Sequence, residues 1–240
     1  MVDIGYLWKP ETPVLAGSQH VKLSTDKILH LGAEDLRLID EEWTAQKLRD
    51  PRIYNGSLAT LLNTEGSAFT YAPTDFKTYL GVQNDRGRLS APLRERLHAG
   101  VIAAVVRFSD GPVLVHRRSA KVSHCAGVLD SSAAGFAIVE NNALDFERTL
   151  ESALSRELGL RDGEIRSVKQ TGAHITEHPE CTGTFDYAID AAVPSTVLDK
   201  RVDWGYFSEC VLIEPAKLPE FIIKHYCDDG DLISEGCAAL

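Results

Sequence analysis

The sequence predicts an α+β protein in which helices cover a mixed β-sheet, and the order of its apolar patterns supports this class. Two β-rich runs, GVIAAVVRF and PVLVHRR, are joined at 109–111 by Ser-Asp-Gly, which is typical of a hairpin. An amphipathic helix is expected over 146–158. Three strand-like runs over 167–175, 185–192 and 204–213 and a helix over 218–226 follow. Strands interrupted by helices in this way indicate an α+β or three-layer αβα arrangement.

The part before residue 98 has a different pattern of apolar and turn residues. We expect it to form a small α+β domain over 1–97, ahead of a second domain over 98–240. A helical pattern ends before Pro51, because the residue ahead of a proline disfavours helix. Turn residues separate the other elements. We expect helices over 33–50, 75–80 and 89–97, and paired strands over 58–63 and 67–71.

Composition limits the classes of partner. The chain has 240 residues, of which 44% are hydrophobic and 25% charged, as in ordinary globular proteins. Its net charge of −10 argues against a nucleic-acid partner, which needs a basic surface, but permits a small anionic ligand held by local arginines. The five cysteines form no CxxC pair and suit reduced thiols. No secretory signal or membrane span is expected, so we expect a cytoplasmic protein.

The most informative segment runs from residue 128 to 160. It reads as a strand over 128–133, a small-residue turn at Ala134-Gly135, a polar loop, and a helix capped by Asp145 and ended by Gly159. Apolar residues at helical spacing mark the buried face of this helix. Glu157 lies one step off that face, so its carboxylate is expected at the edge of the core. Such a carboxylate beside a glycine turn can hold a divalent cation against a diphosphate.

This segment resembles the signature of the Nudix hydrolases, GX5EX7REUXEEXGU, in which U is Ile, Leu or Val. The run 156–160, Arg-Glu-Leu-Gly-Leu, matches EEXGU, and the run 152–154, Ser-Ala-Leu, matches REU. Of the glutamates that build the family's metal site, Glu157 is present, whereas Ala153 and Arg156 replace the others. The spacing back to Gly135 is longer than in the pattern. The resemblance implies a Nudix αβα sandwich with a mixed sheet over 98–240.

The N-terminal part is similar to that of one Nudix branch from animals and plants. Its animal members hydrolyse UDP-glucose and UDP-galactose to UMP and a sugar 1-phosphate with Mg²⁺. This resemblance implies Mg²⁺ as cofactor, with Mn²⁺ as an alternative, a nucleoside diphosphate derivative as ligand, and the homodimer that such domains often form. The matching residues are Trp43, Asn55, Gly56, Asp75, Phe76, Lys77, Tyr79, Gly81 and Asn84.

The candidate metal ligands and catalytic groups are carboxylates. Mg²⁺ keeps several waters, so one or two carboxylates plus ligand oxygens can hold it. Glu157 is the first candidate, although it could instead form a salt bridge with Arg161. Glu151 is the second candidate metal ligand, unless it belongs to a solvated face. Glu180, in the polar loop 174–184, is a candidate catalytic base or an ordinary loop residue. Further substitutes for the missing ligands are Glu140 and Asp145, and Glu177 and His178 are further loop candidates.

The candidate ligand-binding residues are Arg118, Gly135 and Arg156. Arg118 ends a strand and could clamp a phosphate with its guanidinium, or could pair with a nearby acid. Phe136 stands where a second glycine is usual in the family and is expected to narrow the diphosphate cradle.

Two functions from different classes remain. The first is a metal-dependent hydrolase of a nucleoside diphosphate linked to another group, such as the nucleotide sugar UDP-glucose, giving a nucleoside monophosphate and a sugar 1-phosphate. The alternative is a catalytically impaired or repurposed Nudix-fold protein, in which Arg156 replaces the positive charge of the metal and holds a phosphorylated ligand without Mg²⁺-dependent hydrolysis. The resemblance favours the hydrolase.

Overall fold

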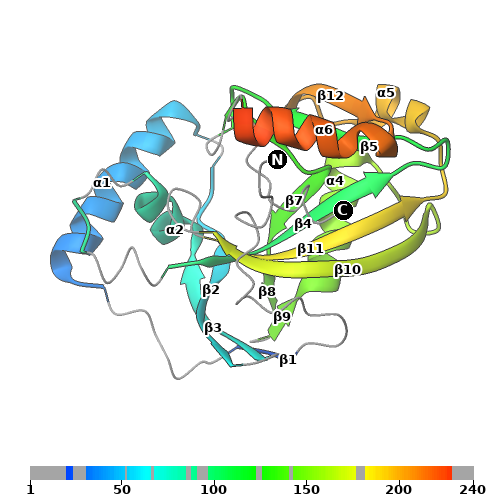
Figure 1. The fold of residues 1–240 in the computed structure, drawn as a ribbon. Helices are drawn as coiled ribbons and strands as arrows, with labels where there is room; N and C mark the ends of the chain where they lie inside the picture. The colour runs from blue at the N-terminus through cyan, green and yellow to red at the C-terminus, as the bar shows by residue number, and fades with distance from the viewer. Residues whose placement is uncertain are drawn as a thin grey trace.

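The structure, a computed structural model, describes residues 20–23, 31–51, 53–65, 68–84, 88–90, 97–122, 126–140, 143–176 and 182–228. Its centre is a ten-stranded mixed sheet, with a separate two-stranded sheet beside it (Figure 1). The strands are β1 (His20–Leu23), β2 (Ser57–Glu65), β3 (Ala68–Asp75), β4 (Ala99–Arg107), β5 (Val113–Arg118), β6 (Leu129–Asp130), β7 (Ala133–Phe136), β8 (Ile138–Glu140), β9 (Ala143–Asp145), β10 (Ile165–Thr176), β11 (Thr182–Ala191) and β12 (Phe207–Ile213).

The helices are short apart from two. They are α1 (Ala33–Arg49), α2 (Phe76–Gln83), α4 (Phe146–Leu158), α5 (Leu198–Arg201) and α6 (Leu218–Ile222). Short 3₁₀ turns lie at Ser195–Val197 and Pro215–Lys217, and a π-helical turn at Ile223–Asp228 follows α6. None of these described helices is both long and apolar enough to cross a lipid bilayer.

The strand order of the large sheet is β1-β3-β2-β4-β11-β10. The pairs β1–β3 and β11–β4 are parallel, whereas β2–β3, β2–β4 and β10–β11 are antiparallel, so the sheet is mixed. The strand β5 follows β4 in a hairpin and pairs with it at a single position. It also pairs with β6 and β12. The strand β10, which ends the order, has 12 residues and contains two bulges against β11.

Helices cover both faces of the sheet, which confirms the expected fold class. In Figure 1, α6 lies in front of the strands and α4 behind them. Side chains of the strand β4 pack against helices on both faces of the sheet, because successive side chains point to opposite faces. Ile102 and Ala104 pack in one apolar cluster with Leu154 of α4, whereas Val105 packs in another with Leu218 of α6.

The N-terminal part continues the same sheet. Thr60 of β2 pairs with Ala99 of β4, so β2 and β3 extend the strands of the second half. The Phe136 ring lies 4.8 Å from the ring of Tyr79 in α2, inside an apolar cluster of mostly N-terminal residues. The division near residue 97 stays a prediction, and the two parts share one sheet and common apolar clusters.

Several elements differ from expectation. The run 128–133 is not one strand, because β6 ends at Asp130 and β7 begins at Ala133. Between them, Ser132 Oγ accepts a hydrogen bond from Val106 N–H of β4 at 2.8 Å and donates one to Leu114 O of β5. This hydroxyl bridges β4 and β5 where they diverge. The expected helix over 89–97 lies mostly outside the described residues, and residues 88–90 and 97–98 are not helical.

Candidate functional site

The helix α4 positions the candidate site, and its sequence fixes both ends. Asp145 is the N-cap, because its side chain accepts a hydrogen bond from Arg148 N–H at 2.8 Å. Gly159 ends the helix in the left-handed region at φ 62°. Both predictions are confirmed. Between these ends, the buried face of α4 rests on β4 and β7.

Glu157 lies on that buried face and is 6% exposed, further inside than the edge of the core that its spacing predicts. One carboxylate oxygen, Oε2, accepts a hydrogen bond from Ala134 N–H of β7 at 3.2 Å. The other, Oε1, accepts from Arg156 Nη2 at 2.7 Å. The expected alternative partner, Arg161, lies beyond the end of the helix at Gly159, so the spacing rule for helical pairs does not apply to it.

Burial raises the pKa of the Glu157 carboxyl, because a desolvated carboxylate loses its hydration. Arg156 and the Ala134 N–H offset part of this rise, and Asp130 adds to it by like-charge repulsion. Asp130 of β6 is therefore close enough to Glu157 to act on it. A carboxylate with a raised pKa is typical of functional sites, although ion-pair networks also produce such shifts.

Arg156 stands between Glu157 and solvent. Its side chain is 45% exposed, and its Cζ lies 5.6 Å from the centre of the Tyr206 ring, within the range of a cation–π contact. Burial disfavours the charge of Arg156, but Glu157 outweighs burial and raises the pKa of the guanidinium. Tyr54, which is 78% exposed, also adds to this rise.

Backbone hydrogen bonds hold Tyr206 in place. Asp203 N–H donates to Glu157 O at 3.2 Å, which ties the turn before β12 to the end of α4. Ser119 N–H donates to Tyr206 O at 2.7 Å, which ties the same turn to the end of β5. The Tyr206 ring is therefore positioned by two elements that also carry candidate ligand-binding residues.

Arg118 at the end of β5 pairs with an acid. Its Nη1 donates to Asp130 Oδ2 at 3.0 Å, and the Arg118 side chain is 22% exposed. Arg118 can pair with this acid and still bind a phosphate, because a guanidinium has several donors. Asp130 acts on Glu157 by like-charge repulsion, and each of these two acids pairs with its own arginine, Asp130 with Arg118 and Glu157 with Arg156.

The described residues do not fit the Mg²⁺ or Mn²⁺ that the resemblance implies. Glu157 is the first candidate metal ligand, and both of its carboxylate oxygens already accept hydrogen bonds. Glu151 is exposed on the opposite, solvent-facing side of α4. Within the described ranges, no three His, Cys, Asp or Glu side chains are grouped to hold a metal ion. The Arg156 guanidinium, 2.7 Å from Glu157 Oε1, lies beside this carboxylate and would repel a divalent cation there.

Gly135 does not form the expected turn. It lies in β7, paired with Ile102 of β4, and faces α4, where an added Cβ would lie 3.6 Å from Thr149 Cγ2. β7 lies beside β4 in the sheet and packs against α4, and an added Cβ at Gly135 would make only ordinary contacts there. Phe136 points into the N-terminal apolar cluster.

The remaining candidate residues lie outside the described residues or have structural roles. Glu180, with Glu177 and His178, lies outside the described residues. Asp145 is the N-cap of α4, and Cys210 is partly buried with a pKa raised to about 11 by burial, so its thiol stays protonated. The sequence did not point to Asp130 or Tyr206. Asp130 follows an apolar strand residue, which is a weak signal, whereas nothing in the sequence spacing marks Tyr206.

Solved structures with similar architecture include three proteins from microorganisms. The protein DR0079 from Deinococcus radiodurans is 19% identical with a TM-score of 0.44, over 71% of this chain and 91% of that chain. The MutT protein from Methanosarcina mazei Go1 is 18% identical with a TM-score of 0.37, over 51% and 79%. The Nudix hydrolase RenU from M. smegmatis is 17% identical with a TM-score of 0.30, over 51% and 73%.

No protein-family model and no curated protein sequence matches the chain. Identities and TM-scores this low assign no activity, so the function proposed next rests on the geometry of the site and on the sequence resemblance.

Proposed function

We propose that this chain binds a small nucleoside diphosphate derivative at the edge of α4, with Arg156 supplying the positive charge that a metal ion supplies in related folds. The observation that carries this proposal is the Arg156 guanidinium 2.7 Å from the buried Glu157 carboxylate. Glu157 orients the guanidinium from below, and nearly half of the Arg156 side chain stays open to solvent. A guanidinium suits phosphate oxygens because its donors form a planar fork.

The nucleoside diphosphate part of the proposal rests on the resemblance described above. A nucleotide sugar such as UDP-glucose is the first ligand to test, and a cytoplasmic location and a homodimer stay predictions. Arg118 is a second cation for the same ligand.

The test is calorimetric binding of UDP-, GDP- and ADP-linked compounds, with either Mg²⁺ or a chelator. We expect equal affinity in both conditions. Arg156→Gln should weaken binding about tenfold or more, because a charge-assisted hydrogen bond is lost. Arg148→Gln, on the same helix, is the matched control and should leave affinity unchanged. Binding that requires Mg²⁺, or that survives Arg156→Gln, would contradict the proposal.

The folding of Arg156→Gln needs its own control, since that substitution leaves a buried carboxylate without its partner. The double variant Arg156→Gln/Glu157→Gln removes both charges together. If the double variant is folded and still does not bind, the loss belongs to the missing guanidinium and not to a disturbed core.

Hydrolysis of the same ligand is the second candidate, and the raised pKa of Glu157 favours it, because a general acid or base works best with a pKa near the working pH. The assay is release of UMP from UDP-glucose with Mg²⁺, with Mn²⁺ and with chelator. Metal-dependent release that disappears in Glu157→Gln would establish the hydrolase and overturn the metal-free binding proposal.

A further inference from the structure

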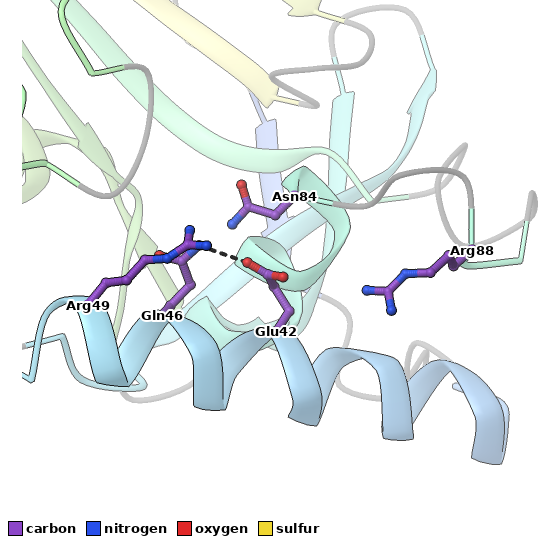
Figure 2. Close-up of a pocket in the computed structure, with 5 residues that line it drawn as sticks. All are labelled: Glu42, Gln46, Arg49, Asn84 and Arg88. Atoms are coloured by element: carbon purple, nitrogen blue, oxygen red, sulfur yellow. Dashed lines mark hydrogen bonds between the residues drawn. The ribbon is translucent and has the colours of Figure 1, made fainter.

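A polar pocket lies between α1 and the end of α2, and none of its residues belongs to the α4 site. It has a volume of about 490 Å³, within the range of small-molecule sites. Its lining is polar and charged, and consists of Glu42, Gln46, Arg49, Asn84 and Arg88 (Figure 2).

The helical spacing of α1 builds one wall of this pocket. Glu42, Gln46 and Arg49 are separated by four and then three positions, so they share one face of the helix. Gln46 is 7% exposed, and its Nε2 donates to Glu42 Oε1 at 2.7 Å. The buried amide therefore holds the Glu42 carboxylate at a fixed place in the pocket.

The charges of the pocket alternate. Arg88 lies toward one end, where its Nη1 is 3.7 Å from Glu41 Oε2, and Arg49 lies in the last turn of α1 at the other. In the view of Figure 2, Glu42 stands between the two guanidinium groups. The pocket thus presents a cation, an anion and a cation in order. A complementary ligand carries two anionic groups with a cationic amine between them.

Asn84 adds a hydrogen-bond donor. Its Nδ2 is buried and has no hydrogen-bond partner within the described part of the chain. A buried amide without a partner is costly, so a ligand oxygen at this position would remove that cost. In Figure 2 the Asn84 side chain reaches from the end of α2 toward the Gln46 side of the pocket.

We infer that this pocket binds a small amino dicarboxylate, with one carboxylate on Arg49 and Asn84, the other on Arg88, and the ammonium on Glu42. Arginine forks recognise carboxylates in a planar, two-bond geometry. Because the whole chain carries a net charge of −10, an anionic ligand is repelled by the average field and needs these local arginines.

The experiment is calorimetric titration of the full chain with L-glutamate, L-aspartate, glutarate and inorganic phosphate. We expect saturable binding of L-glutamate or L-aspartate. Arg49→Gln and Arg88→Gln should each weaken it about tenfold, because each removes charged hydrogen bonds. Arg161→Gln, an exposed arginine outside the pocket, is the matched control and should leave the affinity unchanged.

The role of Glu42 is tested by the amine. L-Glutamate should bind more tightly than glutarate, which lacks the ammonium, and Glu42→Gln should abolish that difference. The inference would be overturned if neither L-glutamate nor L-aspartate binds, or if phosphate alone binds. It would also be overturned if neither arginine variant changes the affinity. A difference between L-glutamate and glutarate that persists in Glu42→Gln would overturn it as well.

Discussion

At the scale of single residues, His116 is the clearest case of a side chain whose pKa is set by its surroundings. It lies in β5, is 1% exposed, and stacks against Phe207 with ring centres 3.9 Å apart. The Ser131 and Ser132 backbone lies near the ring, but within the described residues neither ring nitrogen makes a hydrogen bond of normal geometry. Burial lowers the pKa of His116 to about 4, although Asp130 partly opposes this shift.

This shift predicts a loss of stability in acid. The folded pKa lies below the unfolded value, so the unfolded chain binds more protons between about pH 6.5 and pH 4. Stability is therefore fully present above about pH 6.5 and falls by up to about 3 kcal/mol as the pH drops to about 4. His116→Leu should flatten this part of the profile, measured by urea unfolding across the range. Parallel pH profiles for the two proteins would contradict the assignment.

The residue scale also shows what the sequence could predict of the site. Helical spacing placed Glu157 at the edge of the core, one step short of the buried position that it has. Its partner does not follow from spacing, because neighbouring residues on a helix do not normally face each other. Arg156 reaches Glu157 since β7 presents the Ala134 backbone beside both side chains, and its Nη2 also lies 3.5 Å from Ala134 O. That meeting depends on tertiary packing, which no local pattern encodes.

At the scale of elements, the end of α4 depends on a glycine held close to another segment. Gly159 has φ 62°, and an added Cβ would lie 2.7 Å from Arg201 Cβ. Gly163 has φ 81° but open space around it. The two positions therefore separate the cost of a left-handed backbone from the cost of a close contact.

We expect Gly163→Ala to lower the free energy of unfolding by about 1 kcal/mol, from the left-handed backbone alone. Gly159→Ala should cost about 1–3 kcal/mol more, because the side chain also clashes with α5. Chemical denaturation of both variants gives the comparison. Equal losses would show that the contact at Arg201 relaxes without cost.

Element boundaries were predictable where the local signal is chemical. Asp145 and Gly159 mark the ends of α4 because a cap and a left-handed glycine act within one turn. The break at 131–132 was not predictable, since the Ser132 hydroxyl bonds to β4 and β5, which are distant in the sequence. Gly135 illustrates the same limit, because a glycine suits both a turn and a close-packed strand.

At the scale of the whole molecule, the shared sheet predicts that both halves unfold together. Phe136 packs on Phe76 and Tyr79 of α2, so it connects the second half to the N-terminal cluster. Phe136→Ala should lower the free energy of unfolding by about 3 kcal/mol while keeping one transition. Single-tryptophan variants that retain Trp43 or Trp204 report on each half. Two separate transitions would instead support independent domains over 1–97 and 98–240.

Among the described strands, β10 ends the order of the large sheet, and this edge has a consequence for behaviour in concentrated solution. An edge strand exposes backbone groups that can pair with a second molecule and seed aggregates. This edge is long, at 12 residues, and Val168 on it is 51% exposed. Its two bulges disrupt a flat hydrogen-bonding ladder, and Arg166 and Lys169 place like charges along it. Copies of the chain that approach edge to edge therefore meet both irregular geometry and electrostatic repulsion.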